Sequence, residues 1–245
     1  MGNTYYIASC IFTSKFPKLS KQVQEYVHIK YGFPIVRCCV PKYKIQFFQD
    51  KMPEDYRDEW SELPDCADFQ PGDTVYSLCH NCSAIIEETK PGVIVKSIWE
   101  LILSDEDFIY PDYHRTKITV QDCWRAKERI EEQKTVRTLL QKMNFDIVEL
   151  EDNYDKTDFC GISTYRPAPK RNIVMAPHRF VENAAGKFGD YTEEEQKTFM
   201  EQYCERFETD KVVACCHYCL EGLELGKIDA KHLASLLFED NGWRG

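Results

Sequence analysis

The sequence predicts an α/β fold made of two pseudo-symmetric Rossmann-like halves with parallel sheets. Short β-branched and aromatic runs alternate with helical segments, which is the pattern of a parallel sheet covered by helices. Most of the twelve cysteines follow one pattern that occurs twice, each time at the end of predicted strands. Ligands collect at the carboxyl ends of parallel strands, so we expect metal sites at these strand ends.

The first half, residues 1–112, is predicted to begin with a strand and to alternate from there. Its expected strands span residues 4–9, 33–37, 73–78 and 93–95. Its expected helices span residues 17–31, 83–88 and 97–103. Gly32 is predicted to end the first helix. The stretch between the second and third strands is expected to be mostly loop, because it contains Pro41, Pro53, Pro64 and Pro71.

The second half, residues 113–245, repeats this order with longer insertions. Its expected strands span residues 117–122, 146–150 and 211–215, with an additional strand at 171–175. Its expected helices span residues 125–143, 192–207, 220–225 and 229–239. Thr192, with Glu195 three residues later, is the pattern of a capping box at a helix start.

Composition excludes several classes of protein. The formal net charge of -10 argues against nucleic-acid binding, which normally needs a basic face. No apolar run is long enough for membrane insertion, and the N-terminus lacks a signal-peptide pattern. The expected location is therefore cytoplasmic, where thiols stay reduced and structural disulfides are rare. A cysteine-rich chain in that compartment favours metal or redox chemistry.

The two cysteine sets have the composition of thiolate metal sites. The first consists of Cys10, Cys38, Cys39, Cys79 and Cys82. The second consists of Cys123, Cys160, Cys216 and Cys219, with Cys215 as a candidate fifth ligand. Neighbouring side chains such as those of Cys38 and Cys39 diverge, so they suit a cluster of several irons better than one tetrahedral ion. Iron–sulfur centres also prefer an all-cysteine shell.

A duplicated order of one cysteine, a cysteine pair and a second pair spaced by two residues resembles the CCG-domain proteins. This family includes the B-type catalytic subunit of heterodisulfide reductases, and the resemblance covers nearly the whole chain. It implies a non-cubane [4Fe-4S] cluster that contacts a disulfide substrate and cleaves it reductively. Carried over by position, the cluster ligands would be Cys10, Cys38, Cys39, Cys79 and Cys82.

The sequence departs from the family pattern at both cysteine pairs. Val40 follows Cys39, where the family commonly has glycine, and Phe159 stands where the second half would have the first cysteine of its pair. Phenylalanine cannot bind iron. The second half therefore holds a different iron–sulfur cluster, zinc, or no metal, and the substrate-reactive centre is expected in the first half.

Other residues have simpler interpretations. Cys66 and Cys204 lie outside the repeat and are expected to fill core. His80 and His217 could donate to cluster sulfur or bind zinc, but a solvent-facing or hydrogen-bonding role is the commoner one and is expected here. His178 is a weak candidate for donating a proton to a leaving thiolate, although a loop role is the commoner one. Arg166, Lys170, Arg171 and Arg179 form a basic cluster that would suit an anionic substrate group or a solvated loop.

The resemblance implies a redox role, with a small thiol or disulfide as substrate. No ferredoxin-type cysteine run and no flavin or nicotinamide motif is present, so electrons would come from an electron-donating iron–sulfur or flavin protein. Two alternatives remain open at this point. One is a non-catalytic electron-transfer or assembly subunit, and the other is a zinc-stapled binding module.

Overall fold

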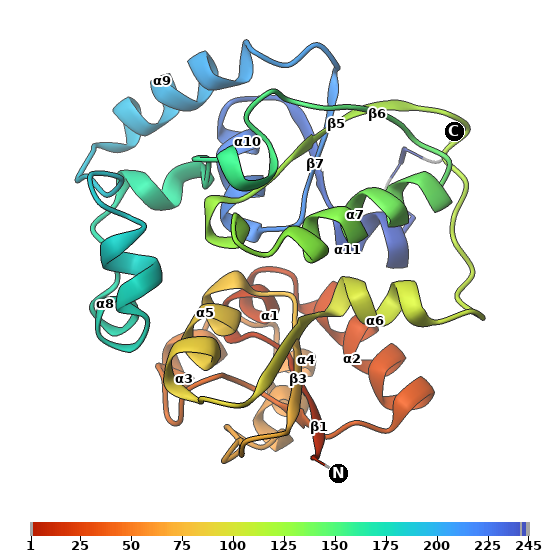
Figure 1. Ribbon diagram of the computed structural model, residues 1–245, viewed down its shortest axis with the longest axis vertical. Helices are drawn as coiled ribbons and strands as arrows, with labels where there is room; N and C mark the ends of the chain where they lie inside the picture. Colours follow the sequence, from red (N-terminus) through yellow and green to blue (C-terminus); the bar gives the residue numbers. More distant parts are fainter. Residues whose placement is uncertain (1, 241, 244–245) are drawn as a thin grey trace. The chain divides into compact units, whose positions relative to one another are not determined.

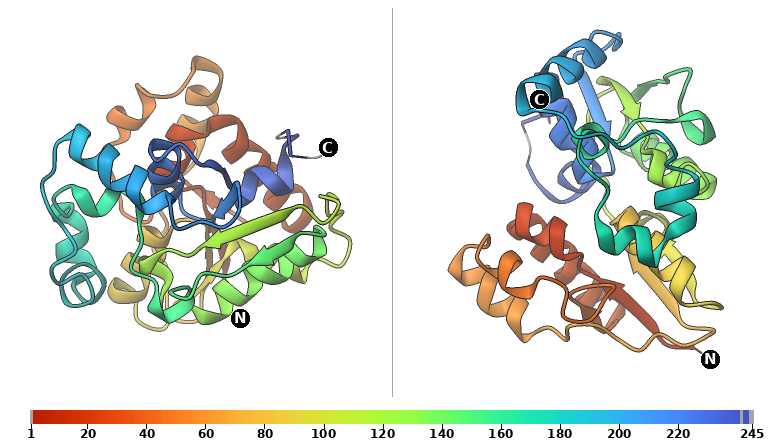
Figure 2. Two further views of the ribbon diagram at one scale, coloured as in Figure 1. Left: turned by 90° about the horizontal axis from the view of Figure 1, so that it is seen from above. Right: turned by 90° about the vertical axis from the view of Figure 1, so that its left-hand side faces the viewer.

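The computed structural model describes residues 2–240, 242 and 243. It divides into two compact units, Met1–Leu101 (unit 1) and Ile102–Gly245 (unit 2). Each unit contains a four-stranded parallel sheet with helices packed against it (Figures 1 and 2). The predicted α/β fold with two parallel sheets is therefore confirmed.

Unit 1 has the sheet order β2-β1-β3-β4, with every neighbouring pair parallel. Its strands are β1 (Thr4–Ile7), β2 (Ile35–Val36), β3 (Thr74–Ser77) and β4 (Ile94–Ser97). Its helices are α1 (Cys10–Lys15), α2 (Pro17–Tyr31), α3 (Ile45–Gln49), α4 (Glu54–Glu62), α5 (His80–Thr89) and α6 (Ile98–Ser104), the last of which crosses into unit 2.

Helix α2 follows the expected pattern at both ends. Pro17 occupies its first turn, where a missing N–H costs nothing, and Gly32 ends it with a φ of 65°. Its buried face presents Leu19, Val23 and Val27 to the core. Helical spacing of these residues made the element predictable over its whole length.

Unit 1 differs from the expectation at three short helices. The stretch that was expected to be loop contains helices α3 and α4, and its prolines lie outside these helices. Pro53 lies just before α4, and the acidic residues Glu54 and Asp55 favour the first turn of that helix. Helices α1 and α3 were missed because six and five residues are too short to show a 3.6-residue period.

Unit 2 repeats the topology with the order β6-β5-β7-β8, again fully parallel. Its strands are β5 (Lys117–Gln121), β6 (Asp146–Val148), β7 (Lys211–Ala214) and β8 (Asp229–His232). Its helices are α7 (Ile130–Lys142), α8 (Lys170–Met175), α9 (Glu193–Cys204), α10 (His217–Leu225) and α11 (Leu233–Phe238). Three short 3₁₀ helices span Trp124–Ala126 (η1), Tyr154–Lys156 (η2) and Gly161–Tyr165 (η3). A short π-helix spans His178–Glu182 (η4).

Unit 2 confirms one local prediction and overturns two. Thr192 caps α9 with the expected capping box to Glu195. The additional strand expected at 171–175 is wrong, because this segment is helix α8. The helix expected over 229–239 begins with strand β8, in which Ala230 and His232 are buried and alternate with more exposed residues.

The helix expected over 125–143 is also interrupted, because the chain forms the short turn η1 before α7 begins at Ile130. This turn keeps Trp124, Arg125 and Ala126 buried immediately after Cys123.

A buried ion-pair network holds the end of β5 against α7. Arg137 donates both terminal nitrogens to the carboxylate of Asp122, at 2.7 and 2.8 Å. It also donates to the two oxygens of Glu149, both at 2.8 Å. Asp122 accepts a further bond from the backbone N–H of Tyr154 at 2.9 Å. The residue that precedes Cys123 is thus fixed from several directions.

None of the described helices combines the length and the apolar composition that crossing a bilayer would need.

We expect Arg137→Ala to destabilise unit 2 by about 3–5 kcal/mol, because it leaves the Asp122 carboxylate buried without its cation. Hydrogen exchange of the β5 and β6 peptides measures this loss. Arg115→Ala is the matched control: its ion pair with Asp146 is mostly exposed and should contribute less than about 1 kcal/mol. Equal exchange in the two variants would contradict the prediction.

Candidate metal centre

Four cysteines of unit 2 form a compact buried group at the carboxyl edge of its sheet. Cys123 follows β5, Cys216 follows β7, and Cys219 lies in the first turn of α10. Cys160 arrives on the loop after β6. All four are at most 5% exposed, and their sulfur atoms all lie within 4.8 Å of one another. The Sγ atoms of Cys123 and Cys160 are 3.3 Å apart.

Two glycines allow the loop with Cys160 to approach helix α10. Gly161 has a φ of +52°, and a Cβ there would lie 1.9 Å from the carbonyl oxygen of Tyr218. A Cβ on Gly222 would lie 2.4 Å from the Cα of Gly161 and 2.8 Å from the sulfur of Met200. The backbone N–H of Trp124 adds a bond to the carbonyl of Phe159, at 2.9 Å. Without side chains at Gly161 and Gly222, the backbone of the loop packs directly against the backbone of α10, and Cys160 reaches the other thiols.

Burial strongly affects the unit 2 thiols. Burial is the largest cause of the raised pKa values of Cys160 and Cys219, which lie well above the usual thiol value. The neighbouring cysteines raise these pKa values further. Burial also raises the pKa of Cys123. Metal binding would displace these protons, because the thiolate is the form that binds a metal.

Arg125 is a cation inside this group. Its side chain is 2% exposed, and one terminal nitrogen donates to the sulfur of Cys160. The other terminal nitrogen donates to the hydroxyl of Ser163 at 2.5 Å. Burial lowers the pKa of Arg125, but the charges of Cys160 and Cys123 outweigh it and raise the pKa overall. The sequence analysis missed this residue, although an arginine two positions after a repeated cysteine was a usable signal.

Phe159 and Cys215 lie beside the group without joining the four sulfurs. The ring of Phe159 stacks on Tyr203 with centroids 4.3 Å apart. Cys215 is buried at 5% exposure just before Cys216. The place of a fifth thiol is thus used for aromatic packing.

Unit 1 brings its five predicted cysteines into one buried region. Cys10 opens α1, Cys38 and Cys39 follow β2, Cys79 precedes α5, and Cys82 lies in its first turn. All five are at most 5% exposed. The sulfurs of Cys10 and Cys38 are 3.6 Å apart, and the neighbouring Cys39 is the first cause that raises the pKa of Cys82 well above the usual thiol value.

The two thiol groups differ in how tightly they are packed. Among the described residues, only the unit 2 set forms a group of three or more ligand atoms that all lie within 4.8 Å of one another. A tetrahedral zinc with Zn–S bonds of about 2.3 Å needs sulfurs roughly 3.8 Å apart. In a cluster of four irons the sulfurs bind different irons and stand further apart. The four unit 2 thiols are therefore close enough together to hold one metal ion.

The other candidate residues occupy different surroundings. His178 lies in η4, half-exposed, with ion-pair contacts to Glu182 at 2.8 Å and Glu128 at 3.3 Å. The hydrogen bond with Glu182 raises the pKa of His178. Glu128 also accepts from the buried Arg179 at 2.7 Å. Arg166 instead lies 3.9 Å from Glu221, so Arg166 and Arg179 have separate acidic partners.

His80 and His217 are both buried in the first turns of α5 and α10, so a solvent-facing position for them is wrong. Cys66 is partly exposed, and burial raises its pKa to about 11. Cys204 lies 4.0 Å from the carbonyl of Leu223, and burial raises its pKa to about 11 as well.

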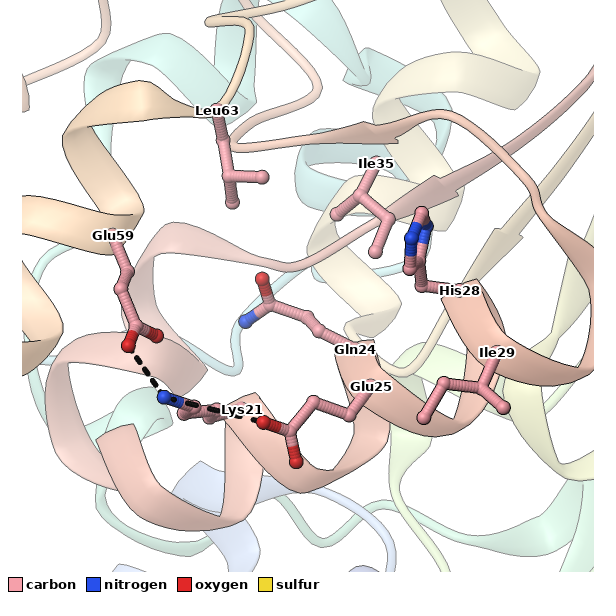
Figure 3. A pocket seen from close by; sticks show the side chains of 8 residues that line it. All are labelled: Lys21, Gln24, Glu25, His28, Ile29, Ile35, Glu59 and Leu63. Atoms are coloured by element: carbon pink, nitrogen blue, oxygen red, sulfur yellow. Dashed lines mark hydrogen bonds and ion pairs between the residues drawn. The ribbon is translucent and has the colours of Figure 1, made fainter.

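A surface pocket of about 440 Å³ lies in unit 1 between α2 and α4. Figure 3 shows Lys21 directed toward the carboxylates of Glu59 and Glu25, with Ile29, Ile35 and Leu63 around the opening. No cysteine lines this pocket, so it is separate from the thiol group of unit 1.

Comparisons with known proteins identify no family. No family model matches the chain, and no curated protein is similar to it. Among solved structures, it is similar to glutamate racemase isoform RacE1 from Bacillus anthracis, with a TM-score of 0.34 and 9% identity. That match covers 96% of this chain and 78% of the other. A TM-score this low does not establish a shared fold.

We expect Gly222→Ala to destabilise unit 2 by about 2 kcal/mol, because the new methyl group would collide with the backbone of Gly161. It should also weaken metal retention there by moving Cys160. Glu224→Ala, on the exposed side of the same helix, is the control and should change neither property. The loss of stability is measured by denaturant unfolding and by hydrogen exchange of the β7 peptide. Wild-type exchange in Gly222→Ala would contradict the predicted destabilisation.

Proposed function

We propose that this chain is an iron–sulfur redox protein that cleaves a disulfide reductively, in the manner of the heterodisulfide reductases that its cysteine pattern resembles. The supporting observation is the set of five buried thiols at the strand ends of unit 1. Disulfide cleavage consumes two electrons and two protons and releases two thiols. An electron-donating iron–sulfur or flavin protein would supply the electrons.

The five thiols fit a multi-iron group by their number and type. Cys38 and Cys39 are adjacent and both buried, and each contacts a different neighbour, Cys10 and Cys82 respectively. Such diverging thiolates can bind different irons of one cluster. When bound, a non-cubane [4Fe-4S] cluster would supply the redox chemistry. The protein's own contribution is to hold five buried sulfurs close to the ends of β1, β2 and β3.

The second half has a different role in this proposal. Four thiols packed within 4.8 Å suit a single tetrahedral ion such as zinc, which would support the fold of unit 2. The same observation favours a second candidate function for the whole chain, that of a zinc-stapled binding module. The metal content of unit 1 separates the two candidates.

We expect anaerobically purified protein to be brown and to contain iron and acid-labile sulfide. The reason is that five buried thiols in a reducing compartment favour cluster assembly over disulfide formation. Metal and sulfide analysis with EPR spectroscopy provides the measurement. Colourless protein with zinc alone, after expression with a competent cluster-assembly system, would refute the iron–sulfur proposal.

We expect Cys38→Ala and Cys39→Ala each to abolish or alter the EPR signal, because each thiolate would bind its own iron or bridge two irons. Cys66→Ala and Cys204→Ala are the matched controls and should keep the wild-type signal. If all four variants retained that signal, the proposed ligand set would be wrong.

A further inference from the structure

Arg125 stands out because it is a buried cation without an acidic partner. Its side chain is 2% exposed, and within the part of the chain that the structure describes it forms no ion pair with a carboxylate. Its Nε has no hydrogen-bond partner there. A buried charge is costly unless it is paired. The other buried arginine beside the sheet, Arg137, has two carboxylates.

The groups around Arg125 orient its charge toward the sulfurs. Aromatic rings of Trp124, Phe180 and Tyr218 surround the guanidinium, with centroids 5.1, 5.3 and 5.5 Å away. Its two terminal nitrogens are directed to Cys160 and Ser163. The thiols of Cys160, Cys123 and Cys216 are the nearby groups that become anionic when they bind a metal. Among the described residues, the partners of the guanidinium are aromatic rings, a hydroxyl and a thiol, with no carboxylate.

The corresponding position of unit 1 carries no charge. Phe12 follows Cys10 by two residues, as Arg125 follows Cys123, and Phe12 is fully buried. The arginine is therefore a specific feature of the four-thiol group and not of the repeated fold.

We propose that Arg125 is the built-in counter-ion of the metal site in unit 2. Four thiolates with one divalent ion carry a net charge of −2, and burying that charge is unfavourable. The guanidinium reduces it to −1 and donates a hydrogen bond to Cys160, which stabilises this sulfur as a thiolate ligand. Arg125 thus acts on metal affinity through the ligands, without binding the metal. This role rests on the metal site proposed above for unit 2.

Cobalt binding tests the role of Arg125 without depending on the native metal. Metal-free full-length protein is titrated with Co²⁺ under anaerobic conditions, and the sulfur-to-cobalt absorption is recorded. The part of the spectrum that is lost in Cys160→Ser belongs to unit 2. Competition with Zn²⁺ then gives the affinity of that site in each variant.

We expect Arg125→Gln to weaken Co²⁺ and Zn²⁺ binding at this site about 10- to 100-fold, the range found when partners of metal ligands are removed. Arg125→Lys keeps the positive charge and should stay within a few-fold of wild type. Ser163→Ala removes the second hydrogen bond but not the charge, so it should also bind like wild type. This pattern would support the counter-ion role.

Several results would overturn the proposal. Wild-type affinity in a folded Arg125→Gln, checked by circular dichroism, would show that the charge does not matter. If Arg125→Gln does not fold, Arg125→Lys decides: a tenfold loss in this charge-conserving variant would refute the role of charge. Absence of any cobalt spectrum that depends on Cys160 in the wild-type protein would instead refute the unit 2 metal site itself, and the counter-ion role with it.

Discussion

Parallel pairing of β1 with β3 and of β5 with β7 is the constraint on which both thiol groups depend. Strands that run in the same direction end at the same edge, so residues that follow different strands meet there. In unit 2 this brings Cys123 and Cys216 together, although 92 residues lie between them in the sequence. The remaining ligands come from the loop after β6 and from the first turn of α10.

The two units use this shared edge for different chemistry. Unit 1 has five buried thiols near its edge, and the buried Phe12 stands two positions after Cys10. Unit 2 replaces one thiol with Phe159, packs the other four closely, and adds the buried Arg125. In the proposal made above, the missing fifth thiol and the added cation both favour a smaller metal group with less negative charge to bury. The repeat therefore preserves the topology while the side chains at the two sheet edges differ.

Close packing around unit 2 makes its site sensitive to substitutions that touch no sulfur. Gly161 and Gly222 set the distance between the Cys160 loop and α10. Arg137 fixes Asp122, the residue before Cys123, through a buried pair of hydrogen bonds. The ligand geometry thus depends on backbone contact and on charge pairing within the same unit. Such supporting contacts hold metal ligands in position before the metal binds.

The sequence by itself determined the α/β class, most strands and helix α2, because these depend on local periodicity and on residues such as Pro17 and Gly32. It also predicted the candidate ligands of both units, since their order repeats along the chain. Strand β8 and helices α1, α3 and α8 were decided by tertiary packing, which overrides weak local preferences in short segments. Only the tertiary structure revealed the contact of Arg125 with Cys160 and the tight spacing of four sulfurs, because both depend on residues far apart in the sequence.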